Sequence, residues 1–278
     1  METFLGLMAI IVVGVIIQRL TSSPTKKYKK LLKQPLSKEH RDIVVKNFKL
    51  FTYLPEEQQK KLEGLINLFL EEKEFTGCEG LEITDEIRVT IAAQACLLLL
   101  NNKTQPWYSK LKSVLVYPSA YKARVKEVND QGFEESHSII RLGESWGGGT
   151  IVLSWSHSRH GAVNFEDGQN VVLHEFAHQL DQDGGAADGV PVLNSTSSYA
   201  SWGILMALEY DKLVRRAMKK QKSVMDKYGA TNEAEFFAVS TESFFEKPRQ
   251  MNKKHPELYA ALEKYYGLNS LEWDYKNH

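Results

Sequence analysis

The arrangement of hydrophobic and polar residues divides the chain into helical segments on either side of a short β-rich region. Apolar residues recur at helical spacing from Pro55 to about Lys73 and again after Thr84, which can cap the second helix. Two runs of strand composition follow at 113–117 and 150–155, the second preceded by three glycines. The helical pattern then returns in segments near 170–181, 199–226, 231–246 and 255–266. This order predicts an α+β fold that is mainly helical and contains a small sheet.

The first apolar segment differs from the others because it contains no charged residue. Residues 4–17 read FLGLMAIIVVGVII, and at ~1.5 Å per residue they would form roughly 21 Å of helix, less than the ~30 Å hydrocarbon core of a bilayer. Arg19 could reach the headgroups and the bilayer could thin locally, so we favour a membrane anchor over residues 4–19. A signal peptide is the second interpretation, although neither a basic start nor a small-residue cleavage site is present. A helix docked on the protein itself is the third.

The charges around this segment predict its direction. Five lysines lie between residues 26 and 33, whereas Glu2 precedes the apolar run. Because basic flanks stay on the cytoplasmic side, the rest of the chain should lie at the cytoplasmic face of the membrane, with a soluble cytoplasmic protein as the alternative. The expected organisation is a hydrophobic segment over 1–20, a basic linker over 21–35, one domain over 36–270 and a tail over 271–278.

Composition excludes several classes of protein. Hydrophobic residues make up 42% and charged residues 25% of the chain, which is typical of a globular domain and not of a disordered or multi-span membrane protein. Lys plus Arg and Asp plus Glu both number 35, so no net charge favours direct binding to nucleic acid. The two cysteines, Cys78 and Cys96, do not make a disulfide scaffold, and Cys96 should be a packed thiol in a reducing compartment.

Candidate chemistry is concentrated in the sequence VVLHEFAHQLD. His174 and His178 are four residues apart on one helix face, so both imidazoles can bind a single cation, and Glu175 can reach a water on that cation. The apolar neighbours predict a buried helix, in which these polar groups would be costly without a metal. Two histidines are an incomplete set, because catalytic zinc sites usually have three protein ligands and one open position.

The third ligand should come from a downstream segment, and no third histidine follows closely. The acidic candidates are Asp181, Asp183, Asp188, Glu233, Glu235, Glu242 and Glu246. A glutamate of NEAEFFA, on a helix that begins after Gly229, is the natural alternative to histidine. Glu235 and Glu242 are seven residues apart and share a face, whereas Glu233 points elsewhere. Glu242 could instead accept a hydrogen bond from a ligand histidine, or form an ordinary salt bridge.

Three sequences in this order, GESWGGGTIVLSW, HEFAHQLD and NEAEFFAVSTESFFEKP, resemble the Mlc titration factor A family of zinc peptidases. The resemblance extends over roughly residues 36–270, and YGATNEAEFFA is also similar to the catalytic domain of anthrax lethal factor. It implies a zincin-like, gluzincin-type metallopeptidase with one Zn²⁺ per chain. It also implies an aminopeptidase-like activity on a peptide or protein substrate and, in enteric bacteria, binding of a transcriptional repressor.

The same resemblance assigns roles to five residues. It implies that His174, His178 and Glu235 bind zinc, that Glu175 is the catalytic glutamate and that Tyr228 assists catalysis. Peptide bonds would then be hydrolysed by a zinc-activated water, with Glu175 as general base and Tyr228 donating a hydrogen bond to the oxyanion. A structural tyrosine before a glycine turn remains the alternative for Tyr228.

The resemblance also gives an expectation for the strand at 150–155. Zincins place at this point the edge strand that pairs with an extended substrate, and a core strand is the alternative. His157 and His160 follow in the loop-like sequence SHSRHG and are expected to be surface histidines, while Trp146 and Trp155 are expected to pack.

Three classes of function remain in competition. A zinc peptidase explains the two histidines, the downstream glutamate and the strand together. A regulatory protein that binds a repressor would need none of them, and a zinc-stabilised structural domain would not need Glu175. We favour the peptidase.

Overall fold

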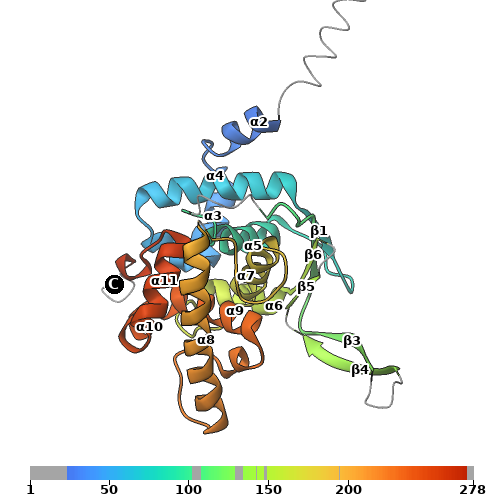
Figure 1. Cartoon of the computed structure of the whole chain (residues 1–278). Coiled ribbons are helices and arrows are strands. Elements are labelled where there is room, and N and C mark those ends of the chain that lie inside the picture. The colour runs from blue at the N-terminus through green and yellow to red at the C-terminus, as the bar shows by residue number, and fades with distance from the viewer. Residues whose placement is uncertain are drawn as a thin grey trace, which may run out of the picture.

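The computed structural model describes residues 24–101, 108–128, 134–141, 143–146, 149–193 and 195–273. Figure 1 shows helices packed together on one side of a small sheet, with a hairpin of two strands extending from the body. The α-helices of the described residues are α2 (Pro24–Leu31), α3 (Lys38–Asn47), α4 (Glu56–Glu72), α5 (Asp85–Leu97), α6 (Trp155–Val163), α7 (Val171–Asp183), α8 (Thr196–Met218), α9 (Glu233–Glu246), α10 (Pro248–Lys254) and α11 (Pro256–Tyr266). Short 3₁₀ turns are η1 (Lys49–Tyr53), η2 (Lys227–Ala230) and η3 (Ser270–Glu272).

The strands form one mixed sheet and a separate hairpin. They are β1 (Glu74–Gly77), β2 (Ser113–Tyr117), β3 (Tyr121–Val128), β4 (Glu134–Arg141), β5 (Gly143–Trp146) and β6 (Thr150–Ser154). The sheet has the order β1-β2-β6-β5, in which the first three strands are parallel and β5 is antiparallel to β6; β3 and β4 pair with each other. A mainly helical chain with this small sheet confirms the predicted α+β class.

The expectation that residues 150–155 form the edge strand is wrong. β6 pairs with β2 on one side, through Ser113 opposite Thr150, and with β5 on the other, through Gly143 opposite Leu153. Its side chains are almost all buried, which agrees with the alternative of a core strand. The end of the sheet next to α7 is β5, which the sequence pattern did not predict because it has only four residues.

Two further segments differ from expectation. SHSRHG is helical, not a loop, because Ser154 caps α6 by accepting a hydrogen bond from the His157 amide. The predicted helix over 199–226 ends at Met218, just before Lys220 takes a left-handed conformation with φ 53°.

The basic stretch expected to be a linker contains α2. This helix packs on α4, where Gly64 leaves space for the chain: a Cβ there would lie 2.1 Å from the backbone oxygen of Leu32. At the other end, Trp273 is buried and donates a hydrogen bond to Gln58 at 3.0 Å. Both contacts involve residues just outside the range 36–270.

The core joins the sheet to the central helices. Buried residues of α5, β2, β6 and α7 contribute to one hydrophobic cluster, which includes Cys96 as the expected packed thiol. Among the described helices, none is long and apolar enough to cross a bilayer. The predicted anchor over residues 4–19 lies outside the described residues.

Candidate metal centre

The helix that carries both histidines begins at a well-formed cap. The Asn170 side chain accepts hydrogen bonds from the amides of Val172 and Leu173, at 3.1 and 3.0 Å, and so satisfies two free donors at the start of α7. The apolar residues of α7 face the core, as expected from the sequence. His174 and His178 lie one turn apart on the face toward α9, with side chains 13% and 12% exposed.

The candidate third ligand comes from the first turn of α9. The Asn232 side chain caps this helix by accepting a hydrogen bond from the Glu235 amide at 2.9 Å. The Glu235 carboxylate points at the two histidines and is 17% exposed. Because the packing of α9 on α7 brings these residues together, three side chains from two distant segments converge at one point.

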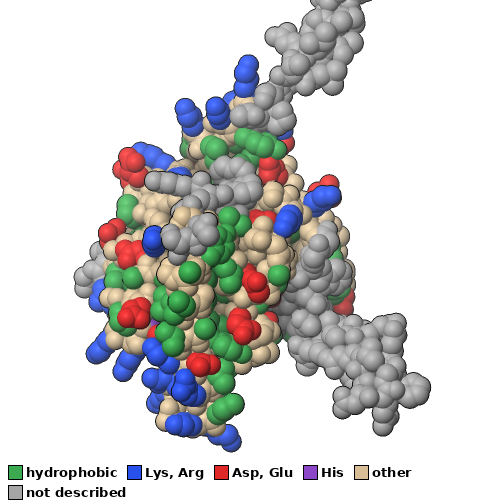
Figure 2. Space-filling view, viewed as in Figure 1, with side chains coloured by type: hydrophobic (Ala, Val, Ile, Leu, Met, Phe, Trp, Pro, Cys, Tyr) green, Lys and Arg blue, Asp and Glu red, His purple; other side chains and the backbone are tan. Residues whose placement is uncertain are grey.

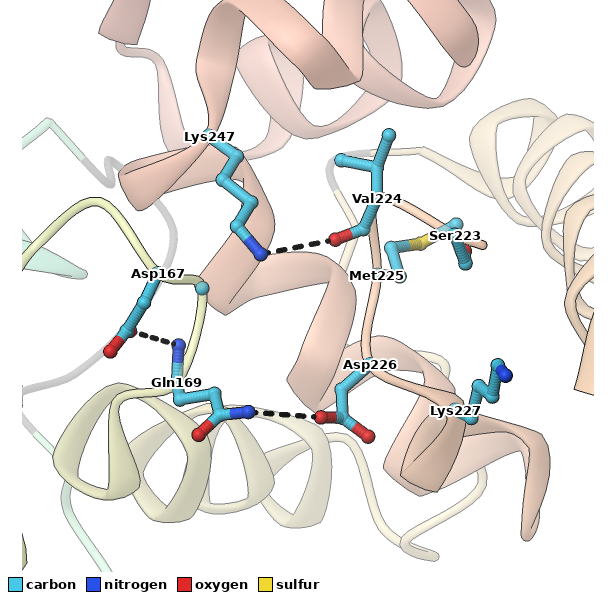
Figure 3. A pocket seen from close by; sticks show the side chains of 9 residues that line it. Asp167, Gln169, Ser223, Val224, Met225, Asp226, Lys227 and Lys247 are labelled. Carbon is cyan, nitrogen blue, oxygen red and sulfur yellow. Dashed lines mark hydrogen bonds between the residues drawn. The ribbon is translucent and has the colours of Figure 1, made fainter. Parts of the chain in front are cut away.

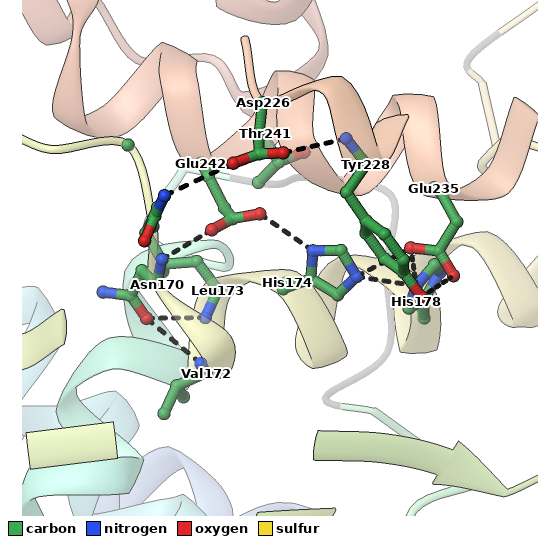
Figure 4. A network of polar contacts seen from close by, with 12 residues as sticks. Asn170, Val172, Leu173, His174, His178, Asp226, Tyr228, Glu235, Thr241 and Glu242 are labelled. Atoms are coloured by element: carbon green, nitrogen blue, oxygen red, sulfur yellow. Dashed lines mark hydrogen bonds and ion pairs between the residues drawn. The ribbon is translucent and has the colours of Figure 1, made fainter. Parts of the chain in front are cut away.

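The three side chains have the spacing of a metal site (Figure 4). The His174 Nε2 atom lies 2.8 Å from Glu235 Oε2 and 3.2 Å from His178 Nε2, and His178 Nε2 lies 3.4 Å from the same carboxylate oxygen. Nitrogen or oxygen atoms ~2.0–2.1 Å from one zinc in a tetrahedral arrangement are separated by about 3.3 Å. The donor set and its spacing therefore fit zinc, and it is the one group of three such ligand atoms that the described residues bring together.

The contacts within this group raise the pKa of His174 and lower the pKa of Glu235. Burial alone would lower the pKa of His174, but hydrogen bonds to Glu235 and Glu242, with the charges of Glu242 and Glu175, raise it well above its usual value. Burial alone would raise the pKa of Glu235, whereas the hydrogen bonds and charges of His174 and His178 hold it well below its usual range. Glu175 is buried beside them, 6% exposed.

A second carboxylate lies behind His174. Glu242 Oε1 accepts from His174 Nδ1 at 2.8 Å, and its other oxygen accepts from the Asn170 amide. With Nδ1 engaged as a donor to Glu242, Nε2 is the atom of His174 that can present a lone pair to a cation beside Glu235. The suggestion that Glu242 accepts a hydrogen bond from a ligand histidine therefore agrees with the observed contact.

Glu246, one turn after Glu242, holds the segment that precedes α7. Its carboxylate accepts from the amides of Gly168 and Gln169, at 2.9 and 3.2 Å, and from the Asn170 side chain at 3.1 Å. Burial and the charge of Glu242 raise the pKa of Glu246, while these N–H donors favour its ionised form. Two carboxylates of α9 thus fix the start of the histidine helix.

Tyr228 lies at the open side of the group. Its hydroxyl is 3.4 Å from Glu235 Oε1, its ring centroid is 6.0 Å from that of His174, and it is 54% exposed. The turn η2 that carries it begins at Asp226, whose carboxylate accepts from the Tyr228 amide at 2.8 Å. The structure therefore brings Tyr228 to the candidate metal ligands.

A pocket of about 260 Å³ lies between residues 167–169, which precede α7, and residues 223–227, which lead into η2 (Figure 3). Gln169 donates to Asp226 across it at 3.3 Å, which links the start of α7 to the Tyr228 turn. Lys247 extends into the same pocket and donates to the Val224 carbonyl at 3.4 Å.

The remaining acidic candidates do not belong to the group of three converging ligand atoms that the described residues form. Asp181 is buried and accepts from the Gly189 amide at 2.8 Å, and burial raises its pKa to about 6. Burial also raises the pKa of Asp183, although the charges of Lys110 and Lys73 oppose that shift. Asp188 and Glu233 are exposed, as the spacing predicted for Glu233.

The histidines His157 and His160 lie outside the group of converging ligand atoms. His157 Nδ1 lies 2.8 Å from the Ser154 hydroxyl, and His160 is exposed and lies 3.4 Å from Asp167. Trp155 packs against the core, whereas the Trp146 side chain lies outside what the structure describes.

Sequence reasoning missed the cap at Asn170, the link from Gln169 to Asp226 and the role of Glu246, which it had considered only as a candidate metal ligand. An asparagine directly before VVLHE is a recognisable helix cap, and a second glutamate four residues after Glu242 would share its face. The contact across the pocket leaves no such pattern, because it joins two loops far apart in the sequence.

Comparison with known proteins gives one family and several relatives, each matched over most of this chain. The family described as glucose-regulated metallo-peptidase M90 matches residues 22–267. An uncharacterized protein of Synechocystis sp. is 41% identical over 244 residues, covering 87% of this chain and 88% of its own length. Mlc titration factor A of Escherichia fergusonii is 31% identical over 222 residues, covering 78% and 82%. The protein of the same name from Cronobacter sakazakii is 30% identical over 226 residues, covering 80% and 83%.

Proposed function

The chain belongs to the glucose-regulated metallopeptidase family M90, and from this premise we propose that it is a zinc-dependent peptidase of the zincin, gluzincin-like type. Its zinc ligands are His174, His178 and Glu235. The observation that carries the proposal is the convergence of their three ligand atoms, with the Glu242 carboxylate oriented behind one of the histidines.

The roles of the other residues follow from their positions. A zinc ion held there would supply a Lewis acid that activates water and polarises a peptide carbonyl. Glu175, next in sequence to His174 and buried beside it, takes a proton from the attacking water and returns it to the leaving amine. Tyr228, which is 54% exposed at the open side of the group, donates a hydrogen bond to the developing oxyanion in exchange for the one that its hydroxyl donates to Glu235 Oε1 at 3.4 Å.

The substrate lies along β5 in this proposal. β5 is the last strand of the described sheet and contacts α7, so an extended peptide added to it would run past the histidine helix. Pairing through the backbone accepts many sequences, because main-chain hydrogen bonds do not depend on side chains. A peptide or protein substrate, with an aminopeptidase preference for free N-termini, is the substrate class we propose.

Zinc analysis combined with hydrolysis of a peptide library tests the assignment. Glu175→Gln should keep zinc and lose hydrolysis, whereas Glu235→Ala should lose zinc because it removes a charged ligand. Glu233→Ala, on the same helix but exposed, is the matched control and should resemble the wild type. Zinc retention by Glu235→Ala would refute the ligand set, and full activity of Glu175→Gln would refute the role of Glu175. Zinc binding by the wild type without hydrolysis of any peptide would favour a structural zinc.

A regulatory role is the second candidate function, favoured by the name Mlc titration factor A of two relatives. A protein that sequesters a transcriptional repressor through another surface would still bind it after Glu175→Gln, since that change leaves the fold intact. Loss of repressor binding in this variant would tie binding to the catalytic site.

The N-terminal segment supports a proposal on location. We expect residues 4–19 to hold the enzyme at the cytoplasmic face of a membrane, because a charge-free apolar run is followed by lysines. The full-length protein should then sediment with membranes at low and high salt. Its recovery in the soluble fraction would reject the anchor and leave the soluble cytoplasmic alternative.

A further inference from the structure

The outer face of α8 carries an exposed hydrophobic row. Ile204 and Leu208 are four residues apart, hence neighbours on the helix surface, and are 66% and 54% exposed. Gly203 and Ala207 are exposed beside them. In Figure 2 hydrophobic side chains follow the upper part of α8, with acidic side chains next to them, and basic side chains gather at its lower end. A contiguous hydrophobic row with a polar border is typical of an interaction site, whereas single exposed apolar residues are not.

A pocket adjoins this row. It has a volume of about 320 Å³ and lies between α8, the loop that contains Gly189 and Val190, and the first turns of α9. Its apolar wall includes Val190, Met206 and Phe236, and Leu208 stands at its border with the exposed row. The row and the pocket together are called the α8 surface below.

The α8 surface is negatively charged. Asp188, Asp211 and Glu233 line the pocket, and no lysine or arginine does. Asp211 has an exposed ion pair with Arg215 at 3.3 Å, whereas Glu233 forms none with any residue that the structure describes. Their field reaches Tyr210, whose pKa is raised by burial and then by the charges of Glu233 and Asp211.

We propose that the α8 surface binds a basic amphipathic segment of a partner protein. An apolar side chain of that segment enters the pocket beside Leu208, and flanking lysines or arginines lie against Glu233, Asp211 and Asp188. Burial of the hydrophobic row supplies the affinity, and the carboxylates select a cationic partner and speed its association. The same negative charge disfavours nucleic acid and anionic lipid as occupants.

The surface is separate from the metal centre but adjacent to it. Glu233 precedes Glu235 by two residues, and Gly189 lies so close that a Cβ there would be 2.5 Å from the Glu233 carbonyl oxygen. A bound partner would therefore contact the turn of α9 that carries the candidate third ligand. The proposal does not depend on the proposed peptidase function, because none of its residues is a metal ligand or catalytic group.

The test measures peptide binding by the full chain in the Glu175→Gln background, so that cleavage cannot interfere. The probe is a fluorescein-labelled synthetic helix of leucine and lysine, compared with a leucine and glutamate helix of the same pattern. We expect the basic peptide alone to bind. Leu208→Asn should weaken binding ~10-fold or more, since it removes one buried apolar side chain. Met218→Asn is the matched control on the same helix, at 78% exposure and away from the pocket, and should change nothing.

The contribution of the carboxylates to binding is tested by varying the salt concentration. Glu233→Gln should weaken binding about 3-fold at low ionic strength, and the difference should vanish near 1 M salt, where screening acts over ~3 Å. Equal affinities of wild type and Leu208→Asn, or equal binding of both peptides, would overturn the proposal. A photo-cross-linker at position 208 distinguishes other occupants. A cross-link to residues 4–19 or to a second copy of the chain would assign the surface to that occupant instead.

Discussion

Replacing Glu242 by glutamine should weaken the metal centre without touching a metal ligand. In the wild type one carboxylate oxygen accepts from His174 Nδ1 at 2.8 Å and the other from the Asn170 amide. Glutamine has one oxygen and one NH₂ group, so it can accept from only one of these two donors. Whichever way the amide turns, an N–H group then faces another N–H group in a buried position.

The magnitude follows from that mismatch. A buried donor left without its acceptor costs about 1–3 kcal/mol. If the mismatch falls on His174, its orientation and tautomer are no longer fixed, and loss of such a partner typically lowers metal affinity 10–100-fold, or ~1.4–2.7 kcal/mol. If it falls on Asn170, the cost appears instead in the free energy of unfolding of the metal-free protein.

Two measurements together test this reasoning. Zinc affinity is obtained by competition with a chromophoric chelator, and the free energy of unfolding of the metal-free protein from urea titration. Glu233→Gln, exposed on the same helix, is the control for the change of charge. The reasoning would be refuted if Glu242→Gln left both quantities within ~0.5 kcal/mol of the wild type, since the buried mismatch must cost more than that.

Three further predictions concern the surroundings of the site. Tyr228→Phe should lower kcat by roughly 10–1000-fold at constant zinc content, and an unchanged kcat would make this tyrosine structural. Burial raises the pKa of Asp181 from 3.8 to about 6, so the folded state takes up a proton more readily than the unfolded state. Relative to Asp181→Asn, the wild type should therefore gain ~1 kcal/mol in unfolding free energy between pH 7 and pH 5; a difference independent of pH would contradict the shift. Gly189→Ala should destabilise the fold by ~1–3 kcal/mol in urea titration, because φ is +79° and the new Cβ would lie 2.5 Å from the Glu233 carbonyl oxygen. Gly203→Ala, where the Cβ has open space, should be neutral or stabilising, and equal effects of both changes would contradict the steric argument.

The long helices could be predicted because their signals are local. Thr84 caps α5 as expected, accepting from the Ile87 amide, and the apolar spacing located α4, α7 and α9 within a few residues. The resemblance to the Mlc titration factor A family is confirmed by the family match. The strands β2 and β6 were predicted, whereas the four-residue strands β1 and β5 were missed because so short a segment carries too little pattern, and the β3–β4 hairpin was missed as well. The place of β6 inside the sheet depends on pairing that no local sequence records.

The candidate site, like the fold, could be predicted from the sequence only where its geometry is local. The spacing of His174 and His178 follows from helix geometry alone, and so does the common face of Glu235 and Glu242. The convergence of the two helices is a property of their packing, and the choice of Glu235 over six other acidic residues came from resemblance. The position of Tyr228 next to the ligands also depends on tertiary structure, because the turn that begins at Asp226 sets it.

The carboxylates of Glu242 and Glu246 have a consequence for local opening of the chain. Backbone amides of a loop usually exchange their hydrogens through small fluctuations. Here the three consecutive amides of residues 168–170 donate to carboxylates of α9, and the Gln169 amide donates to Asp167 as well, so movement of α9 away from α7 would break hydrogen bonds of all three. That movement would also separate Glu235 from the histidines. Slow hydrogen exchange in this loop would therefore report the lifetime of the assembled metal centre, and the loop should exchange as a unit with α9 although it has no regular secondary structure.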